Sequence, residues 1–214
     1  MKPFIQCNNV VIGINHPLNK NCINCSIMKD DKILLQGENG VGKTTFLRSI
    51  LNLQPLIEGD IVIQNKSVER MKRFEIGREI GYLHQQPAFQ LFAMTVWEEL
   101  VLYLSFKEKV NDLEDKAHQL AKKLKIDHLY ENHPQLCSKG EQQRIALASI
   151  LLQEPTFLLL DEPTAALDDE SVDILLTTIK EHNIGYIMVS HDPRVSLKDT
   201  KQWMFTQEGL HEEI

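Results

Sequence analysis

The sequence predicts an α/β protein: a core with a parallel sheet, an N-terminal antiparallel β region and an inserted helical subdomain. Two short apolar runs, at residues 157–160 and 186–189, are continuous rather than alternating, which is typical of parallel strands buried on both faces. The helical pattern of residues 169–182 lies between them. A strand, a helix and a second strand in this order favour a right-handed crossover within one parallel sheet.

The two ends of the chain supply the rest of this core. Further strands are predicted, from β-branched or alternating runs, in residues 4–14, 22–35, 61–63 and 80–83. Apolar side chains at helical spacing predict a helix over residues 45–53, and Pro55 ends it. We therefore assign residues 1–87 and 151–214 to the α/β core of a single domain.

Residues 88–150 differ in character from both flanking parts. Apolar side chains recur there at helical spacing within Lys- and Glu-rich segments, as Trp97 and Leu100 or Leu120 and Leu124 illustrate. We interpret these stripes as core packing between helices. The segment is thus predicted to be a helical subdomain inserted into the α/β core.

Composition and charge exclude several classes of protein. Apolar residues make up 43% of the 214 residues and charged residues 25%, as in an ordinary globular protein. A net charge of −7 gives no sign of the basic surface of a nucleic-acid-binding protein. No apolar run approaches the roughly 20 residues of a transmembrane helix, and the N-terminus lacks the apolar segment of a secretory signal. We expect a cytoplasmic protein that reaches a membrane only through a partner.

One cysteine pair has a spacing that zinc and redox sites use. Cys22 and Cys25 form a CxxC pattern, but a zinc site needs about four ligands and no second pair is present. The surrounding stretch is strand-like, whereas a redox CxxC opens a helix. We interpret the pair as reduced, partly buried thiols that pack as small apolar groups.

A glycine-rich loop follows one of the predicted strands. Residues 37–44 read Gly-Glu-Asn-Gly-Val-Gly-Lys-Thr and match the phosphate-binding pattern GxxxxGK[ST], between a predicted strand and a predicted helix. Such glycines let backbone N–H groups surround phosphate oxygens, and the helix N-terminus adds favourable charge. The residues expected to contact nucleotide here are Gly37, Asn39, Gly40, Gly42, Lys43, Thr44 and Thr45.

Two acidic residues at the end of a strand complete a nucleotide triphosphatase pattern. Asp161 and Glu162 follow the apolar run 157–160, downstream of the phosphate loop. P-loop enzymes hold Mg²⁺ with such a strand-end aspartate and the hydroxyl that follows the loop lysine, here Thr44. Glu162 lies one residue further, where it could orient or deprotonate the attacking water. The predicted ligands are therefore a nucleoside triphosphate, expected to be ATP, and Mg²⁺.

Further segments occur in the order that one family shows. Residues 137–144 read Cys-Ser-Lys-Gly-Glu-Gln-Gln-Arg, residues 161–168 read Asp-Glu-Pro-Thr-Ala-Ala-Leu-Asp, and residues 190–192 read Ser-His-Asp. With Gln85 they resemble the signature, the D-loop, the switch histidine and the Q-loop glutamine of ABC ATPases. The resemblance covers the chain from Phe4 to about residue 208.

The resemblance implies a dimer that encloses two ATP molecules, either a homodimer or a heterodimer with another ABC ATPase. Ser138 and the Gly140 N–H of one subunit would contact the γ-phosphate bound to the other. It further implies that His191 contacts the γ-phosphate, that Gln85 senses Mg²⁺ or water, and that Asp168 belongs to the nucleotide-contacting D-loop. Glu162, His191 and Gln85 are then the expected catalytic residues.

The chain departs from the family pattern at three positions. Cys137 stands where leucine is usual, and Lys139 replaces the first glycine of the signature. Ile14 stands where the family usually has an aromatic residue that stacks on adenine. An aliphatic contact lacks that stacking contribution, so we expect modest nucleotide affinity and loose base selectivity.

The resemblance also implies a separate membrane permease that ATP hydrolysis drives, with the chain attached to the inner face of the cell membrane. Apolar side chains that could dock it or fill the subdomain core are Phe89, Leu91, Phe92, Met94 and Trp97. The run at residues 90–93 is similar to ATPases of energy-coupling-factor importers. A soluble ABC ATPase of a non-transport system, such as the iron–sulfur assembly type, remains the alternative.

Overall fold

Strands dominate both ends of the chain, and most of the helices lie between them. The structure is a computed structural model that describes residues 2–102, 110–195 and 200–213. Its strands are β1 (Ile5–Val11), β2 (Ile23–Ile27), β3 (Lys32–Gln36), β4 (Glu58–Ile63), β5 (Lys66–Ser67), β6 (Ile80–Leu83), β7 (Phe157–Asp161), β8 (Gly185–Val189), β9 (Lys201–Thr206) and β10 (Gly209–Glu213). Its α-helices are α1 (Lys43–Ile50), α2 (Arg73–Glu79), α3 (Val96–Val101), α4 (Val110–Lys123), α5 (Lys139–Leu151) and α6 (Asp169–His182).

A mostly parallel sheet lies at the centre. In the described part of the chain it has six strands in the order β10-β9-β3-β8-β7-β6, with β10 antiparallel to β9. All residues of β7 and β8 are buried, which explains their continuously apolar sequences. The carboxyl ends of the parallel strands lie at one edge, where the glycine loop follows β3 and Glu162 follows β7. The predicted α/β fold class is confirmed.

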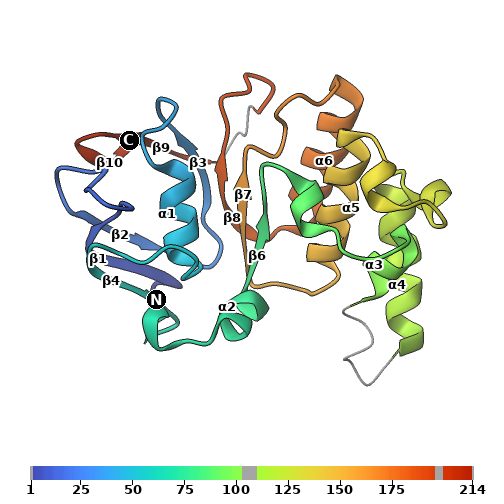
Figure 1. Cartoon of the computed structure of the whole chain (residues 1–214), viewed down its shortest axis with the longest axis horizontal. Coiled ribbons are helices and arrows are strands. Elements are labelled where there is room, and N and C mark those ends of the chain that lie inside the picture. Colours follow the sequence, from blue (N-terminus) through green and yellow to red (C-terminus); the bar gives the residue numbers. More distant parts are fainter. Residues whose placement is uncertain (1, 103–109, 196–199, 214) are drawn as a thin grey trace.

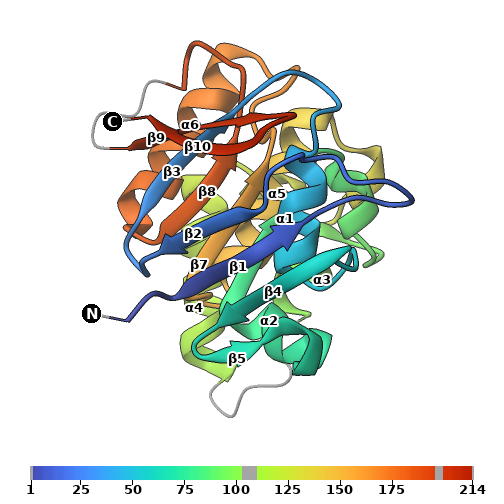
Figure 2. The same cartoon turned by 90° about the vertical axis from the view of Figure 1, so that its left-hand side faces the viewer.

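An antiparallel sheet and α1 cover one face of the parallel sheet. Among the described residues this second sheet has four strands in the order β2-β1-β4-β5, and Figure 2 shows it nearest the viewer. Phe157 and Leu159 of β7 pack on this side, in a buried cluster with Phe46 of α1 and Phe205 of β9. The N-terminal antiparallel region predicted from the sequence is thus present.

Helices α3 to α6 cover the opposite face, on the right of Figure 1. Leu158 and Leu160, which alternate with the residues above, join a second buried cluster that includes Leu147 of α5 and Leu175 of α6. Residues 88–150 contain α3, α4 and most of α5, as the helical pattern predicts. Because α5 shares its core with the sheet, the subdomain boundaries at residues 88 and 150 stay a prediction. None of the described helices is long and apolar enough to cross a membrane.

The CxxC residues separate in the structure. Cys25 is a buried residue of β2 opposite Cys7 of β1, whereas Cys22 is exposed. A hydrogen bond with the Cys25 thiol, together with burial, raises the pKa of Cys7 well above its usual range. The described residues contain no group of three or more His, Cys, Asp or Glu side chains arranged to hold a metal ion. Cys7 and Cys25 both belong to a buried cluster of apolar residues that includes the antiparallel sheet.

Candidate nucleotide-binding site

Two glycines shape the loop between β3 and α1. Gly37 has φ +144°, and a Cβ there would lie 2.1 Å from the carbonyl oxygen of Phe205, so glycine is required. Gly42 has φ +118° and precedes Lys43, the first residue of α1. The loop therefore bends sharply into the N-terminus of an eight-residue helix, where backbone N–H groups suit phosphate oxygens.

Lys43 folds back over this loop. Its Nζ donates hydrogen bonds to the carbonyl oxygens of Gly37, at 2.5 Å, and Glu38, at 2.9 Å. Burial lowers the pKa of Lys43, and the nearby carboxylates of Glu162 and Asp161 oppose that shift. A buried ammonium group bonded to neutral carbonyls gains by exchanging them for charged phosphate oxygens.

Thr44 and Asp161 face each other below the loop. Thr44 Oγ1 donates a hydrogen bond to Asp161 Oδ1 at 3.1 Å. The Tyr82 hydroxyl donates to the other carboxylate oxygen, Asp161 Oδ2, at 3.2 Å. Magnesium ions prefer oxygen ligands and commonly take one or two from protein beside phosphate and water. The paired hydroxyl and carboxylate therefore fit the magnesium ion that accompanies ATP.

Glu162 follows β7 in an uncommon backbone conformation. Its φ is +49°, and its N–H donates a hydrogen bond to the Val189 carbonyl at 3.0 Å. Left-handed φ values in non-glycine residues are uncommon and cluster at functional sites. Burial raises the pKa of the Glu162 carboxyl, while His191 and Lys43 act against that shift. Because His191 Nε2 lies 3.7 Å from Glu162 Oε1, a carboxylate and an imidazole stand together at the strand ends.

One pocket of about 320 Å³ collects most of the predicted residues. Its lining consists of Asn39, Gly40, Gly42, Lys43, Thr44, Thr45, Gln85, Asp161, Glu162 and Val189. All of these except Val189 were expected from the sequence to contact nucleotide or Mg²⁺ or to act in catalysis. His191 joins the pocket through Glu162, and Gly37 joins it through Lys43.

The loop that carries Ile14 lies against the phosphate loop. Ile12 and Leu18, which flank this loop, lie close to Gly42. A Cβ on Gly42 would be 3.1 Å from Ile12 Cδ1 and 3.3 Å from Leu18 Cδ1. Ile14 itself is 75% exposed and is not part of the pocket lining, so its contact with adenine stays a prediction.

The sequence profile of a known family matches more than half of the chain. The profile of the ABC transporter family covers residues 21–165, which include the glycine loop, the signature segment at 137–144 and Asp161. The chain belongs to the ABC transporter family. A putative ABC transporter ATP-binding protein of Methanocaldococcus jannaschii is 35% identical over 184 residues, which cover 79% of this chain and 64% of that protein. One of Bacillus thuringiensis subsp. konkukian is 36% identical over 200 residues, 91% of this chain and 36% of that protein.

The chain thus spans less than two thirds of the length of these curated relatives. Solved structures show the same fold. CbiO1 of Clostridium perfringens, part of the ABC transporter complex CbiONQ, has a TM-score of 0.82 at 25% identity, covering 99% of this chain and 88% of that chain. The ATP-binding cassette MJ0796, a dimer in a post-hydrolysis state bound to ADP and Pi, has a TM-score of 0.84 at 25% identity. The match covers 98% of this chain and 97% of that chain.

The ABC signature segment begins α5. Ser138 is the N-cap, and its N–H and Oγ donate to Glu141 Oε2 at 2.7 Å and 2.8 Å. Lys139 is exposed at the first helical position. A Cβ on Gly140 would lie 2.9 Å from Ser171 Oγ, so α5 packs against α6 through this glycine. Ser138 and Gly140 do not line the pocket, so their contact with ATP on a second subunit stays a prediction.

Asp168 caps a helix within the chain. Its Oδ1 accepts a hydrogen bond from the Ser171 N–H at 2.8 Å, and its Oδ2 accepts one from Ser171 Oγ at 2.9 Å. These bonds lower the pKa of Asp168. Since the carboxylate is occupied by the first turn of α6, the expected nucleotide contact of this ABC D-loop residue stays a prediction.

A polar network below Gln85 was missed by the sequence analysis. Arg48 Nη2 lies 3.0 Å from His84 Nε2, and Tyr82 reaches Asp161 as described above. Burial lowers the pKa of His84 and raises that of Tyr82. The available signal was that Tyr82 and His84 alternate at the end of a predicted strand, which places both side chains on one face.

Proposed function

We propose that this chain is the ATP-binding and ATP-hydrolysing subunit of an ABC transporter. The observation that carries the proposal is the single pocket that joins Lys43, the Thr44–Asp161 pair and Glu162, with His191 beside Glu162. These groups supply phosphate recognition, magnesium ligands and a base for water, which are the requirements of ATP hydrolysis. Membership of the ABC transporter family supports the transport role.

Binding of ATP uses groups that the chain holds ready. Lys43 exchanges its bonds to the Gly37 and Glu38 carbonyls for oxygens of the β- and γ-phosphates. Thr44 and Asp161 would hold Mg²⁺ together with Gln85, which lines the same pocket. When bound, Mg²⁺ neutralises charge on the phosphate oxygens and orients them.

Hydrolysis then depends on Glu162 and His191. The oxygen of a water molecule bonds to the γ-phosphorus while the bond to the β,γ-bridging oxygen breaks, which yields ADP and phosphate. Glu162 accepts the proton of that water, and its raised pKa makes it a better acceptor than an ordinary carboxylate. His191, beside Glu162, donates a hydrogen bond to the γ-phosphate and holds it in line.

We infer that two such subunits close on each other around ATP. The N-terminus of α5 carries partial positive charge, and Ser138 and Lys139 are exposed there. Each subunit's α5 would face the phosphates on the partner, which produces a symmetric interface of two equivalent halves. The dimeric state of the similar cassette bound to ADP and Pi supports this arrangement.

An apolar surface after the Q-loop suits a membrane permease. Phe89, Phe92 and Met94 are 67%, 78% and 69% exposed. Leu91 is buried, and Trp97 packs into an aromatic cluster of the helical region. Three of the five candidates are therefore exposed and available for docking, whereas Leu91 and Trp97 pack in the core. Several large apolar side chains exposed within six residues are a feature typical of a protein interface.

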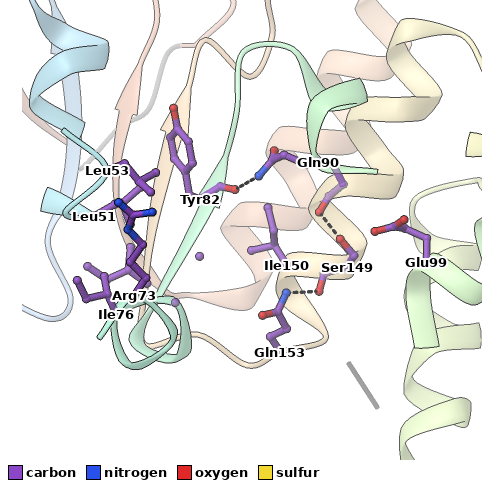
Figure 3. A pocket seen from close by; sticks show the side chains of 14 residues that line it. Leu51, Leu53, Arg73, Ile76, Tyr82, Gln90, Glu99, Ser149, Ile150 and Gln153 are labelled. Carbon is purple, nitrogen blue, oxygen red and sulfur yellow. Dashed lines mark hydrogen bonds between the residues drawn. The ribbon is translucent and has the colours of Figure 1, made fainter. Parts of the chain in front are cut away.

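Gln90, the residue after Phe89, lines a groove of about 240 Å³ (Figure 3). Most of its lining residues come from α2 and β6 on one side and from α3 and α5 on the other. Arg73 and Ile76 lie on one wall and Glu99 lies on the opposite wall (Figure 3). A groove lined by a mixture of apolar and polar side chains, such as Ile76 and Gln153, fits an amphipathic helix from the cytoplasmic side of a permease. The chain would then be peripheral on the inner face of the membrane.

The test is recovery of tagged Glu162→Gln protein from detergent-solubilised source membranes with ATP and Mg²⁺, followed by mass spectrometry of what accompanies it. A multi-span permease is the expected partner. Phe92→Ser in the same background should lose the permease, and Phe92→Ser alone should still hydrolyse ATP. Recovery of soluble proteins only, with the chain absent from the membrane fraction, would replace transport by the soluble assembly alternative.

A further inference from the structure

Arg194 bridges two loops at the edge of the ATP site. Its Nε donates to both carboxylate oxygens of Asp192, at 2.9 Å and 3.1 Å, and its Nη2 donates to Asp192 Oδ2 at 2.7 Å. Its Nη1 donates to Asp169 Oδ1 at 2.6 Å and to the Leu167 carbonyl at 3.2 Å. One guanidinium group therefore holds the segment after β8 and the segment between β7 and α6 together.

The geometry needs a guanidinium group. Its donors are arranged in a rigid planar fork, so it can grip one carboxylate in two places while another nitrogen reaches a second segment. A lysine has one nitrogen on a flexible stem and cannot reproduce that fork. The bonds from Arg194 hold the pKa of Asp192 at about 2, so this carboxylate stays charged at neutral pH.

Both bridged segments adjoin parts of the proposed ATP sites. Asp192 directly follows His191, which lies 3.7 Å from Glu162 beside the pocket of the chain's own ATP. Asp169 begins α6, directly after the cap residue Asp168. Arg194 thus connects the histidine at one ATP site to the first turn of α6.

The first turn of α6 in turn abuts the signature segment. Arg144 Nη1 donates a hydrogen bond to Ser171 Oγ at 2.6 Å, and that hydroxyl donates to Asp168 Oδ2 at 2.9 Å. Gly140 lies so close that a Cβ there would be 2.9 Å from Ser171 Oγ. Because this contact is tight and hydrogen-bonded, a displacement of the α6 N-terminus has to move the start of α5 as well.

We propose that Arg194 is a positioning residue that couples the two ATP sites of the dimer through a single subunit. It ties the loop of His191, at the subunit's own ATP, to the α6 turn that supports the signature segment facing the partner's ATP. Contact of His191 with the γ-phosphate fixes the loop, and the bridge transmits that restraint to residues 138–144. The inference rests on the proposed function, since it needs ATP in the glycine loop.

The direct test is amide hydrogen exchange on the dilute monomer, with and without ATP and Mg²⁺. In the wild type, ATP should slow exchange in the glycine loop, residues 37–45, and also in residues 138–144. In Arg194→Gln, the glycine loop keeps its protection and residues 138–144 lose theirs. Lys125→Gln is the matched control, because it removes a 2.6 Å ion pair to Glu170 in the same turn of α6 but does not touch the His191 loop.

Kinetics supply a second readout. Arg194→Gln should lower kcat about tenfold, which corresponds to about 1.4 kcal/mol, and reduce the Hill coefficient for ATP towards one, with the monomer's ATP affinity unchanged. Arg194→Lys should recover only part of both losses. Asp169→Asn added to Arg194→Gln should cause little further loss, because both substitutions break the same bridge.

Each result separates the two ideas. If ATP does not slow exchange in the glycine loop of the wild type, the proposed function is contradicted. The coupling role is overturned if ATP still protects residues 138–144 in Arg194→Gln. It is also overturned if ATP protects only the glycine loop in the wild type. Equal effects of Lys125→Gln and Arg194→Gln would also overturn it, because they would reflect general support of α6. If Arg194→Gln fails to fold, Arg194→Lys and Asp169→Asn carry the same comparison.

Discussion

Replacement of Glu162 by glutamine tests the assignment of the base. Glutamine has nearly the same size, and the backbone bond from residue 162 to the Val189 carbonyl is unaffected by the change. The substitution removes the proton acceptor and one negative charge near Lys43 and His191. Loss of a general base costs about 10²- to 10⁴-fold in rate, so kcat should fall by about that factor. ATP affinity should not fall, because one repulsive charge near the γ-phosphate has been removed.

The assay is phosphate release at saturating ATP and Mg²⁺, paired with equilibrium binding of a fluorescent ATP analogue. Glu170→Gln is a suitable control, because that carboxylate is exposed and paired with Lys125 on the surface. It should leave both quantities within about twofold, as is usual for an exposed ion pair. A Glu162→Gln protein that keeps at least a third of the wild-type kcat would refute the base assignment. Loss of ATP binding in that variant would instead show that Glu162 supports the pocket structurally.

Three further outcomes are expected. Gly37→Ala should weaken ATP binding by about 1–3 kcal/mol in a binding titration, because residue 37 has a φ of +144° and a Cβ there would clash with Phe205. Gly77→Ala is the control and should leave ATP binding unchanged, because a Cβ at residue 77 would meet nothing within 4 Å. Ile14→Tyr should tighten ATP binding about fivefold by stacking on adenine, and an unchanged dissociation constant would remove that residue from the site. The pKa of Asp192, about 2 when folded, lies below its unfolded value, so its stabilising effect is present above about pH 4 and is lost as pH falls through 2. Arg194→Gln should therefore lower the melting temperature most above pH 4, and a difference that grows at lower pH would contradict the sign.

The strands that carry the site could be predicted because burial on both faces leaves a continuous apolar sequence. This holds for β7 and β8, and the glycine loop adds a motif whose spacing is fixed by phosphate geometry. Helix α2 was missed because its seven residues give too few turns for an apolar period. Strand β5 has two residues and no pattern at all. Strand β9 was missed although buried Trp203 and Phe205 alternate with more exposed residues, so period-two counting would have found it.

The unpredicted parts of the site depend on contacts between residues far apart in the sequence. Tyr82 and Asp161 are 79 positions apart, and they meet because β6 and β7 are neighbouring parallel strands. Arg194 and Asp169 are 25 positions apart and meet only once the crossover through α6 is complete. Motif spacing specifies groups that act on one ligand from one loop. Motif spacing does not specify which side chains from other segments hydrogen-bond to those groups and orient them.

The capped N-terminus of α5 shows why lysine can replace glycine in the ABC signature. Lys139 is the first residue of α5, where ordinary helical dihedrals suit any L-residue, so glycine is not required there. Ser138 donates its hydroxyl hydrogen to the Glu141 carboxylate, and that negative charge would face the incoming γ-phosphate of the partner. The exposed ammonium group of Lys139, one residue from Ser138, would offset this charge as two subunits approach. Lys139→Gly should therefore weaken ATP-dependent dimerisation at low salt and have little effect at high salt, where screening removes the difference. Analytical ultracentrifugation in the Glu162→Gln background measures this directly, and a loss that is equal at both salt concentrations would assign Lys139 a structural role instead.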